Sequence, residues 1–203
     1  MKKTYSPKGT YQGLNEIIKK LRSKEGCPWD REQTHNSLKP NLVEEMYETL
    51  EAIDANNIKG MTEELGDILT QILFHAQIGE ENNTFSDKDI FTEAENKLIR
   101  RHPHVFDKSP MPQTSQEVER NWEQIKKNER QERQSILDGP SKLAPSLSYA
   151  QSIGKRAARS GFDWNKESEI FEKLDEEINE LHNAKTTLEV EHEIGDILLT
   201  ITN

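Results

Sequence analysis

The chain has 203 residues, of which 32% are hydrophobic and 32% are charged, and its formal net charge is −10. This acidic balance disfavours a general surface for nucleic-acid polymers or anionic membranes, and no apolar run approaches the ~20 residues of a membrane-spanning helix. A single cysteine, Cys27, excludes an internal disulfide and a cysteine metal cluster, so the composition indicates a soluble protein in a reducing, cytoplasmic setting.

Few glycines and many Glu, Lys, Leu and Gln residues predict an all-α chain. The first helix is expected over about 11–24. Asp30 and Gln33 have the spacing of a capping box and predict a short helix over about 30–38. Trp29, just before this box, is expected to pack in the core, because a Trp in a small helical domain is usually well buried.

Two helices that carry rows of acidic residues are expected next, over about 40–56 and 61–80. The first of them also carries an apolar stripe of helical period, which consists of Leu42, Val43, Met46, Leu50 and Ile53. The first contains EExxE, Glu44–Glu48, and the second contains ExxD, Glu64–Asp67. Residues three or four apart share a helix face, and the turn-like segment 56–60 is short enough to fold the two helices antiparallel. A single EExxE or ExxD motif is best interpreted as a solvated acidic face of a surface helix. Brought together, four carboxylates repel one another and favour a divalent cation with oxygen ligands, and Mg²⁺ is the cation that suits phosphate chemistry.

A basic helix end follows the acidic pair. Ser86 is expected to cap a helix over 87–101, whose last turns carry Lys97, Arg100 and Arg101. At spacings of three and four, Lys97 shares a face with both arginines. These cations either hold a triphosphate, for which the Arg fork is suited, or simply offset the negative end of the helix dipole.

The chain is expected to form two domains, 1–137 and 147–203, joined by a linker over 138–146 that contains Gly139, Pro140 and Pro145. Before the linker, the capping-box spacing of Thr114 and Glu117 predicts a long helix that continues to about Gln134. After the linker, helices are expected over about 147–159, 166–185 and 187–202.

The acidic pattern occurs a second time in the C-terminal part. EExxE recurs at Glu176–Glu180 and ExxD at Glu193–Asp196, and the run ELGDIL at 64–69 returns as EIGDIL at 193–198. A solvated face has no need to repeat its acids at matched spacing, so we interpret both sets as metal sites. The last expected helix still shows its apolar pattern where the chain ends at Asn203, and the second domain is therefore expected to be truncated after ExxD.

The repeated EExxE and ExxD pattern resembles the MazG family of nucleoside triphosphate pyrophosphohydrolases. The flanking runs GCPWDREQT at 26–34 and RRHPHVF at 100–106 agree with this resemblance. WEQIK at 122–126 and GFDW at 161–164 are similar to the two-domain members. The resemblance implies an all-α fold of two tandem MazG-like helical bundle repeats, and it implies that the helices associate into a homodimer.

The resemblance also implies the reaction, which is hydrolysis of a nucleoside triphosphate to the monophosphate and pyrophosphate. This house-cleaning of the nucleotide pool would depend on Mg²⁺, with Mn²⁺ as a substitute. The metal ligands carried over from the family are Glu45, Glu48, Glu64, Asp67, Glu177, Glu180, Glu193 and Asp196. Glu44 and Glu176, the first Glu of each EExxE, are expected to orient water or the ligands during catalysis. The expected substrate contacts are Lys97, Arg100, Arg101 and Lys173, and the first-repeat position that matches Lys173 is Asn41.

Three other functions stay open at this point. A non-catalytic helical dimerisation or interaction module with vestigial acidic sites would bind Mg²⁺ without turnover. A narrower pyrophosphatase for dUTP or dCTP would use the same carboxylates with a more selective base pocket. A carboxylate-bridged di-iron bundle is disfavoured because such bundles use Glu-x-x-His pairs, whereas the matching positions here are Glu48, Asp67, Glu180 and Asp196.

Overall fold

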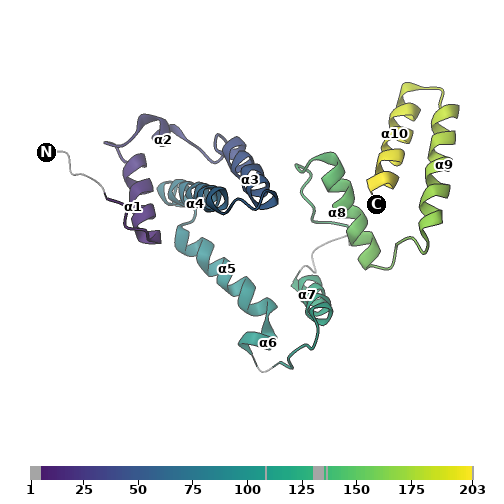
Figure 1. Cartoon of the computed structure of the whole chain (residues 1–203). Helices are drawn as coiled ribbons and strands as arrows, with labels where there is room; N and C mark the ends of the chain where they lie inside the picture. Colours follow the sequence, from purple (N-terminus) through teal and green to yellow (C-terminus); the bar gives the residue numbers. More distant parts are fainter. Residues whose placement is uncertain (1–5, 108, 130–134, 136, 203) are drawn as a thin grey trace. The chain divides into compact units, whose positions relative to one another are not determined.

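Every regular element of the described chain is a helix (Figure 1), which confirms the predicted all-α class. The computed structural model describes residues 6–107, 109–129, 135 and 137–202. Within these residues, no helix is both long enough and apolar enough to cross a membrane. The chain forms two compact units, Met1–Trp122 and Glu123–Asn203.

Most helices begin and end within a few residues of their predicted bounds, and the bounds expected for the helix after Ser86 are confirmed. In chain order the helices of the described residues are α1 (Tyr11–Arg22), α2 (Pro28–Glu32), α3 (Lys39–Asp54), α4 (Ile58–Glu81), α5 (Asp87–Arg101), α6 (Pro103–Phe106), α7 (Ser115–Glu129), α8 (Ser146–Arg159), α9 (Glu167–Asn183) and α10 (Thr187–Thr202). The stretch up to Gln134 that the sequence assigned to α7 lies partly outside the described residues.

The short helix expected over 30–38 was predicted wrongly. Helix α2 begins at Pro28, whose ring presets a helical φ, and it ends at Glu32. After it, the Thr34 amide donates to Ser37 Oγ (2.9 Å) and the Ser37 amide donates to Thr34 Oγ1 (3.1 Å). These side chain–backbone bonds compete with helical bonds and produce a turn. The expectation that Trp29 packs in the core was also wrong, because this side chain is 58% exposed.

The core of the first unit lies between α1 and the C-terminal half of α4. Ile18 from α1 and Leu73 from α4 are each 1% exposed, and Leu38, Phe74 and Ile78 complete the cluster. Fully burying a side chain of this size contributes about 1.5–3 kcal/mol. This core fixes α4, which carries half of the first acidic set.

Helices α3 and α4 pack against each other as the predicted hairpin (Figure 1). Asn56 adopts a left-handed φ of 51° in the turn, a conformation that Asn tolerates better than most residues. The Asn57 side chain then accepts a hydrogen bond from the Gly60 amide at 3.0 Å and caps α4. The short turn and its cap therefore place EExxE and ExxD on neighbouring helices.

The apolar stripe predicted on α3 is exposed within the single chain. Helix α3 buries Thr49 and Ala52 instead. The stripe residues are each at least 37% exposed, and they are Leu42, Val43, Met46, Leu50 and Ile53. Periodicity therefore identified an apolar face correctly, but the residues that bury this helix against its own unit lie elsewhere.

The second unit contains a matching hairpin of α9 and α10, with α8 packed on α10 (Figure 1). In the first turn of α10, the Glu189 carboxylate accepts hydrogen bonds from the backbone amides of the two residues that precede the helix, Lys185 (2.6 Å) and Thr186 (3.1 Å). These two bonds lower the pKa of Glu189, because they stabilise its charged form. An acidic residue at the start of α10 thus fixes the turn that sets the second ExxD beside the second EExxE.

Candidate metal centres

The first acidic set converges across the α3–α4 hairpin. Glu45 and Glu48 of α3 and Glu64 of α4 each place a carboxylate oxygen so that the three oxygens lie within 4.8 Å of one another. Glu45 and Glu48 share a face because they are three residues apart, and the hairpin brings Glu64 to that face. We call these three residues the first cluster.

Electrostatic repulsion is the main feature of the first cluster. Partial burial and the charges of Asp67, Glu48 and Glu64 raise the pKa of Glu45. Loss of solvent and the facing carboxylate of Glu48 raise the pKa of Glu64. A divalent cation would remove this repulsion, and an all-oxygen donor set suits a hard cation.

Two residues predicted for this site lie at its margin. Asp67, whose side chain is one carbon shorter than Glu, is exposed and is not among the three converging oxygens. Its charge nevertheless raises the pKa values of Glu45 and Glu64, so it lies close enough to interact. Glu44 is exposed and contributes a smaller rise to the pKa of Glu45. The ligand role of Asp67 and the orienting role of Glu44 stay predictions.

The second acidic set converges in the same way across the α9–α10 hairpin. Carboxylate oxygens of Glu177 and Glu180 from α9 and Glu193 from α10 lie within 4.8 Å of one another. We call these residues the second cluster. Partial burial and the charge of Glu180 raise the pKa of Glu193. The repeated motif therefore produces a repeated arrangement of three carboxylates.

A lysine distinguishes the second cluster from the first. Lys173 Nζ lies 2.8 Å from Glu177 Oε1 and 3.1 Å from Glu176 Oε1, and these contacts raise the pKa of Lys173. Glu177 is only 4% exposed, and its second oxygen, Oε2, is buried without a hydrogen-bond partner. A buried carboxylate oxygen without a donor is unfavourable, and a cation would satisfy it. This donor set therefore fits a bound metal ion.

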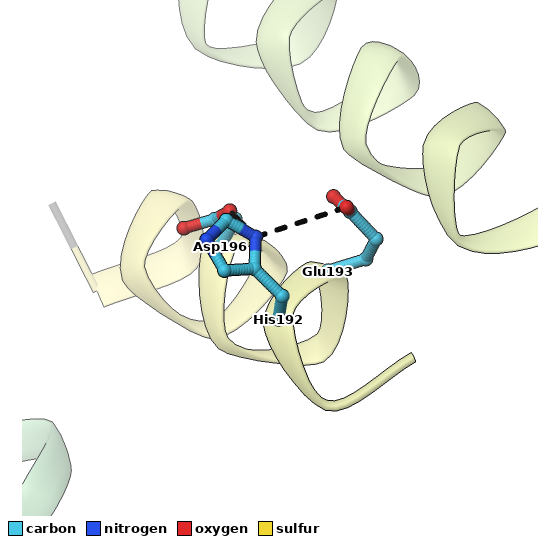
Figure 2. A group of neighbouring side chains, drawn as sticks. All are labelled: His192, Glu193 and Asp196. Carbon is cyan, nitrogen blue, oxygen red and sulfur yellow. Dashed lines mark ion pairs between the residues drawn. The ribbon is translucent and has the colours of Figure 1, made fainter. Parts of the chain in front are cut away.

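Asp196 contacts His192, a residue that was not among the predicted site residues. His192 Nδ1 lies 3.0 Å from Asp196 Oδ2 and 3.7 Å from Glu193 Oε1 (Figure 2). The signal was present in the sequence, because His192 and Asp196 are four residues apart and therefore share a helix face. His192 directly precedes the second ExxD motif and is not part of its acidic pattern, so the repeat of the acids alone does not indicate it.

Three of the four residues predicted to bind phosphate, Lys97, Arg100 and Arg101, lie in the last turns of α5. Lys97 Nζ lies 3.7 Å from Glu93 Oε1 on its own helix. Arg100 and Arg101 occupy the last turn of α5, where cations also stabilise the helix dipole. Contact of these three residues with a triphosphate stays a prediction, and so does that of Lys173.

A second histidine feature was also missed. The Nδ1 atoms of His35 and His75 lie 2.8 Å apart, and their rings stack with centroids 5.1 Å apart. The ring of Phe85 stacks on His35 at 5.6 Å. Burial and the neighbouring His35 lower the pKa of His75. Because 40 residues separate the two histidines, local spacing gave no signal for this contact between α4 and the turn before α3.

A family profile and several known proteins match this chain. The family profile of the MazG nucleotide pyrophosphohydrolase domain matches residues 33–106, which include the first cluster. The chain is 47% identical over 194 residues to the nucleoside triphosphate pyrophosphohydrolase/pyrophosphatase MazG of Thermotoga maritima, covering 95% of this chain and 74% of that protein. It is 41% identical over 198 residues to the nucleoside triphosphate pyrophosphohydrolase of Escherichia coli K12, covering 94% and 75%. The crystal structure of a mazG-related protein from Thermotoga maritima aligns with a TM-score of 0.49 and 28% identity over 57% of this chain and 98% of that one.

Proposed function

The chain belongs to the MazG nucleotide pyrophosphohydrolase family, and from this premise we propose that it hydrolyses nucleoside triphosphates to the monophosphate and pyrophosphate, as a nucleotide-pool house-cleaning enzyme. The observation that carries the proposal is the convergence of three carboxylates in each of two matched hairpins. A hydrolase that handles triphosphates needs groups that hold a divalent cation against phosphate oxygens, and these clusters supply them.

In this proposal the residues bind the metal ion, orient water or the ligands, or bind the phosphates. Mg²⁺, or Mn²⁺ in its place, would supply charge neutralisation and a lowered pKa for the attacking water. Glu45, Glu48, Glu64 and Asp67 would hold the ion in the first repeat, and Glu177, Glu180, Glu193 and Asp196 would hold it in the second. Glu44 and Glu176 orient water or the ligating carboxylates from the side of each cluster. Lys97, Arg100, Arg101 and Lys173 bind the phosphates.

The two repeats are not chemically equal under this proposal. Lys173 places a positive charge beside Glu176 and Glu177, whereas Asn41 occupies the matching position in the first repeat. Glu63 places another negative charge beside Glu64 in the first repeat. The corresponding position in the second repeat is His192, which directly precedes Glu193. The first cluster therefore needs more cationic charge from its surroundings than the second does.

The test of the proposed function is product formation from a panel of ribo- and deoxyribonucleoside triphosphates that includes dUTP and dCTP. We expect the full chain to release pyrophosphate and monophosphate in equal amounts with Mg²⁺, and EDTA to reduce the rate by about 100-fold or more. Phosphorus NMR distinguishes this cleavage from release of orthophosphate. Turnover confined to dUTP or dCTP would favour the narrower pyrophosphatase, and Mg²⁺ binding by a folded protein without turnover would favour the non-catalytic module.

We also propose that the chain forms a homodimer through α3 and α4, and that it works in the cytoplasm, where nucleoside triphosphates are used. Beyond the backbone of its own helix and the adjacent residues, an added Cβ at Gly66 would meet no atom within 4 Å, so α4 leaves room for the close approach of another helix. An exposed apolar surface of this kind is typical of an interaction site. The exposed large apolar side chains of these helices include Leu42, Val43, Met46, Tyr47, Leu50, Ile53, Leu65, Leu69 and Ile72.

Replacing Leu50 by Lys is expected to shift the chain from dimer to monomer, because the buried charge would lack a partner in the interface. Light scattering after size-exclusion chromatography gives the mass directly. Leu143→Lys is the matched control, since Leu143 is 89% exposed and lies outside both helices, and this variant is expected to remain dimeric. A parent protein that is monomeric at all concentrations would contradict the proposed dimer.

A further inference from the structure

Three neighbouring side chains of α10 combine a nitrogen donor with two carboxylates. His192 Nδ1 lies 3.0 Å from Asp196 Oδ2 and 3.7 Å from Glu193 Oε1, and the contact with Glu193 is the dashed line in Figure 2. One potential ligand atom from each residue lies within 4.8 Å of the other two. The His192 side chain is 74% exposed, so one side of the group is open to water or to a phosphate oxygen.

This nitrogen donor is specific to the second repeat. Alignment of the two ExxD motifs places His192 opposite Glu63, so the first repeat offers oxygen donors only. Oxygen-only sites suit Mg²⁺, whereas imidazole is a better ligand for Zn²⁺, Co²⁺ and similar ions. The positions i and i+4 on one helix can share a metal ion, as the two histidines of HExxH motifs do. His192 and Asp196 have this spacing.

Buried carboxylate oxygens without hydrogen-bond partners lie in the second cluster, which shares Glu193 with this group. Glu177 is 4% exposed, and its Oε2 is buried without a hydrogen-bond partner. Glu193 belongs both to the second cluster and to the group with His192. Its Oε1 faces His192, while its Oε2 is buried and also has no partner. Unpaired buried oxygens of this kind are rare in proteins and are satisfied by a bound ion or water.

We propose that His192 is a metal ligand and that the second repeat therefore accepts, besides Mg²⁺, a transition-metal ion such as Co²⁺ or Zn²⁺ through His192, Glu193 and Asp196. The shared carboxylate of Glu193 links this position to the second cluster. The inference rests on the proposed carboxylate metal site of the second repeat, but it adds a ligand and a class of ion. The first cluster remains a site for a hard cation.

The experiment uses the full chain without a polyhistidine tag. Co²⁺ is titrated into the parent, His192→Gln and His182→Gln, and binding is followed by the visible absorption of Co²⁺ and by calorimetry, with parallel Mg²⁺ titrations. His182 is an exposed histidine of α9 outside the metal-binding groups, so its variant is the matched control. We expect His192→Gln to weaken Co²⁺ binding by about tenfold or more and to change its spectrum. Mg²⁺ affinity should change by less than about twofold, because the oxygen ligands remain.

The outcomes separate this inference from the proposed function. His192-dependent Co²⁺ binding by a chain that releases no pyrophosphate would keep the inference and refute the function. Pyrophosphate release together with equal Co²⁺ affinity in the parent and His192→Gln would refute the inference and keep the function. Absence of Co²⁺ binding to the folded parent would also refute the inference. Thermal unfolding of each variant shows whether it is folded, and both are expected to match the parent because both histidines are exposed.

Discussion

Changing Glu64 and Glu193 together to Gln is expected to lower Mg²⁺-dependent pyrophosphate release by about 100-fold or more. Each residue contributes an oxygen to one of the two clusters, and Gln replaces a charged ligand with a neutral amide. A metal ion supplies several kcal/mol of charge stabilisation in such a reaction, and each 1.36 kcal/mol corresponds to about a factor of ten in rate. Each single variant is expected to remove the turnover of its own repeat and to leave that of the other.

Loss of activity in these variants should not come from unfolding. The folded chain raises the pKa values of Glu64 and Glu193, so the fold favours their neutral forms, which Gln resembles in shape and charge. We therefore expect thermal unfolding in EDTA at the same or a higher temperature than that of the parent. The additional stabilisation that Mg²⁺ gives to the parent should be smaller in the variants, because they bind the ion more weakly.

The matched controls are Glu51→Gln on α3 and Glu172→Gln on α9. Both residues are exposed glutamates on the same helices as the clusters, and neither belongs to a converging group. Their rates should stay within about twofold of the parent, as expected for surface substitutions away from the site. A double variant that keeps the parental rate would show that the clusters are not the site of hydrolysis, and a single variant that abolishes turnover would place the chemistry in one repeat.

Local spacing was enough to predict most of the helices and the pairs of acidic residues within each motif. The capping box of Ser86 with Asp89 starts α5 where the sequence placed it, because its partners are three residues apart. Glu45 and Glu48 share a face for the same reason. The short turn at Asn56 and Asn57 extended this logic to the hairpin, since so few residues leave antiparallel packing as the simple solution.

Local spacing did not predict contacts between residues that are distant in sequence. It also did not predict side chain–backbone hydrogen bonds that replace the hydrogen bonds of a helix. The contact of His35 with His75 joins residues 40 positions apart, and no periodic pattern reports it. The reciprocal bonds of Thr34 and Ser37 replaced the predicted helix by a turn. The α3 stripe shows a further limit, because periodicity identifies an apolar face without saying which surface covers it.

Replacing Arg22 by Ala is expected to lower the free energy of unfolding of the first unit by about 2–3 kcal/mol. Arg22 is 8% exposed and joins three segments of the chain. Its Nη2 donates to Glu81 Oε2 (2.7 Å), and its Nη1 donates to the carbonyl oxygens of Asp30 (2.6 Å) and Gln33 (3.1 Å). Breaking a buried ion pair by removing one partner typically costs about 3–5 kcal/mol. We expect a cost at or below the lower end of this range, because the Glu81 side chain is 36% exposed and can regain water.

The pH dependence distinguishes loss of this ion pair from a general loss of packing. Hydrogen bonds from Arg22 lower the pKa of Glu81, so the pair contributes its stability above the pKa of an unfolded Glu and loses it as the pH falls through the lower folded value. The difference in urea stability between the parent and Arg22→Ala should therefore shrink between about pH 7 and about pH 3. Lys20→Ala is the matched control, since the exposed pair of Lys20 with Glu25 (3.2 Å) should contribute less than about 1 kcal/mol. If Arg22→Ala destabilised the unit no more than Lys20→Ala does, Arg22 would not be the residue that ties α1 and α2 to the end of α4.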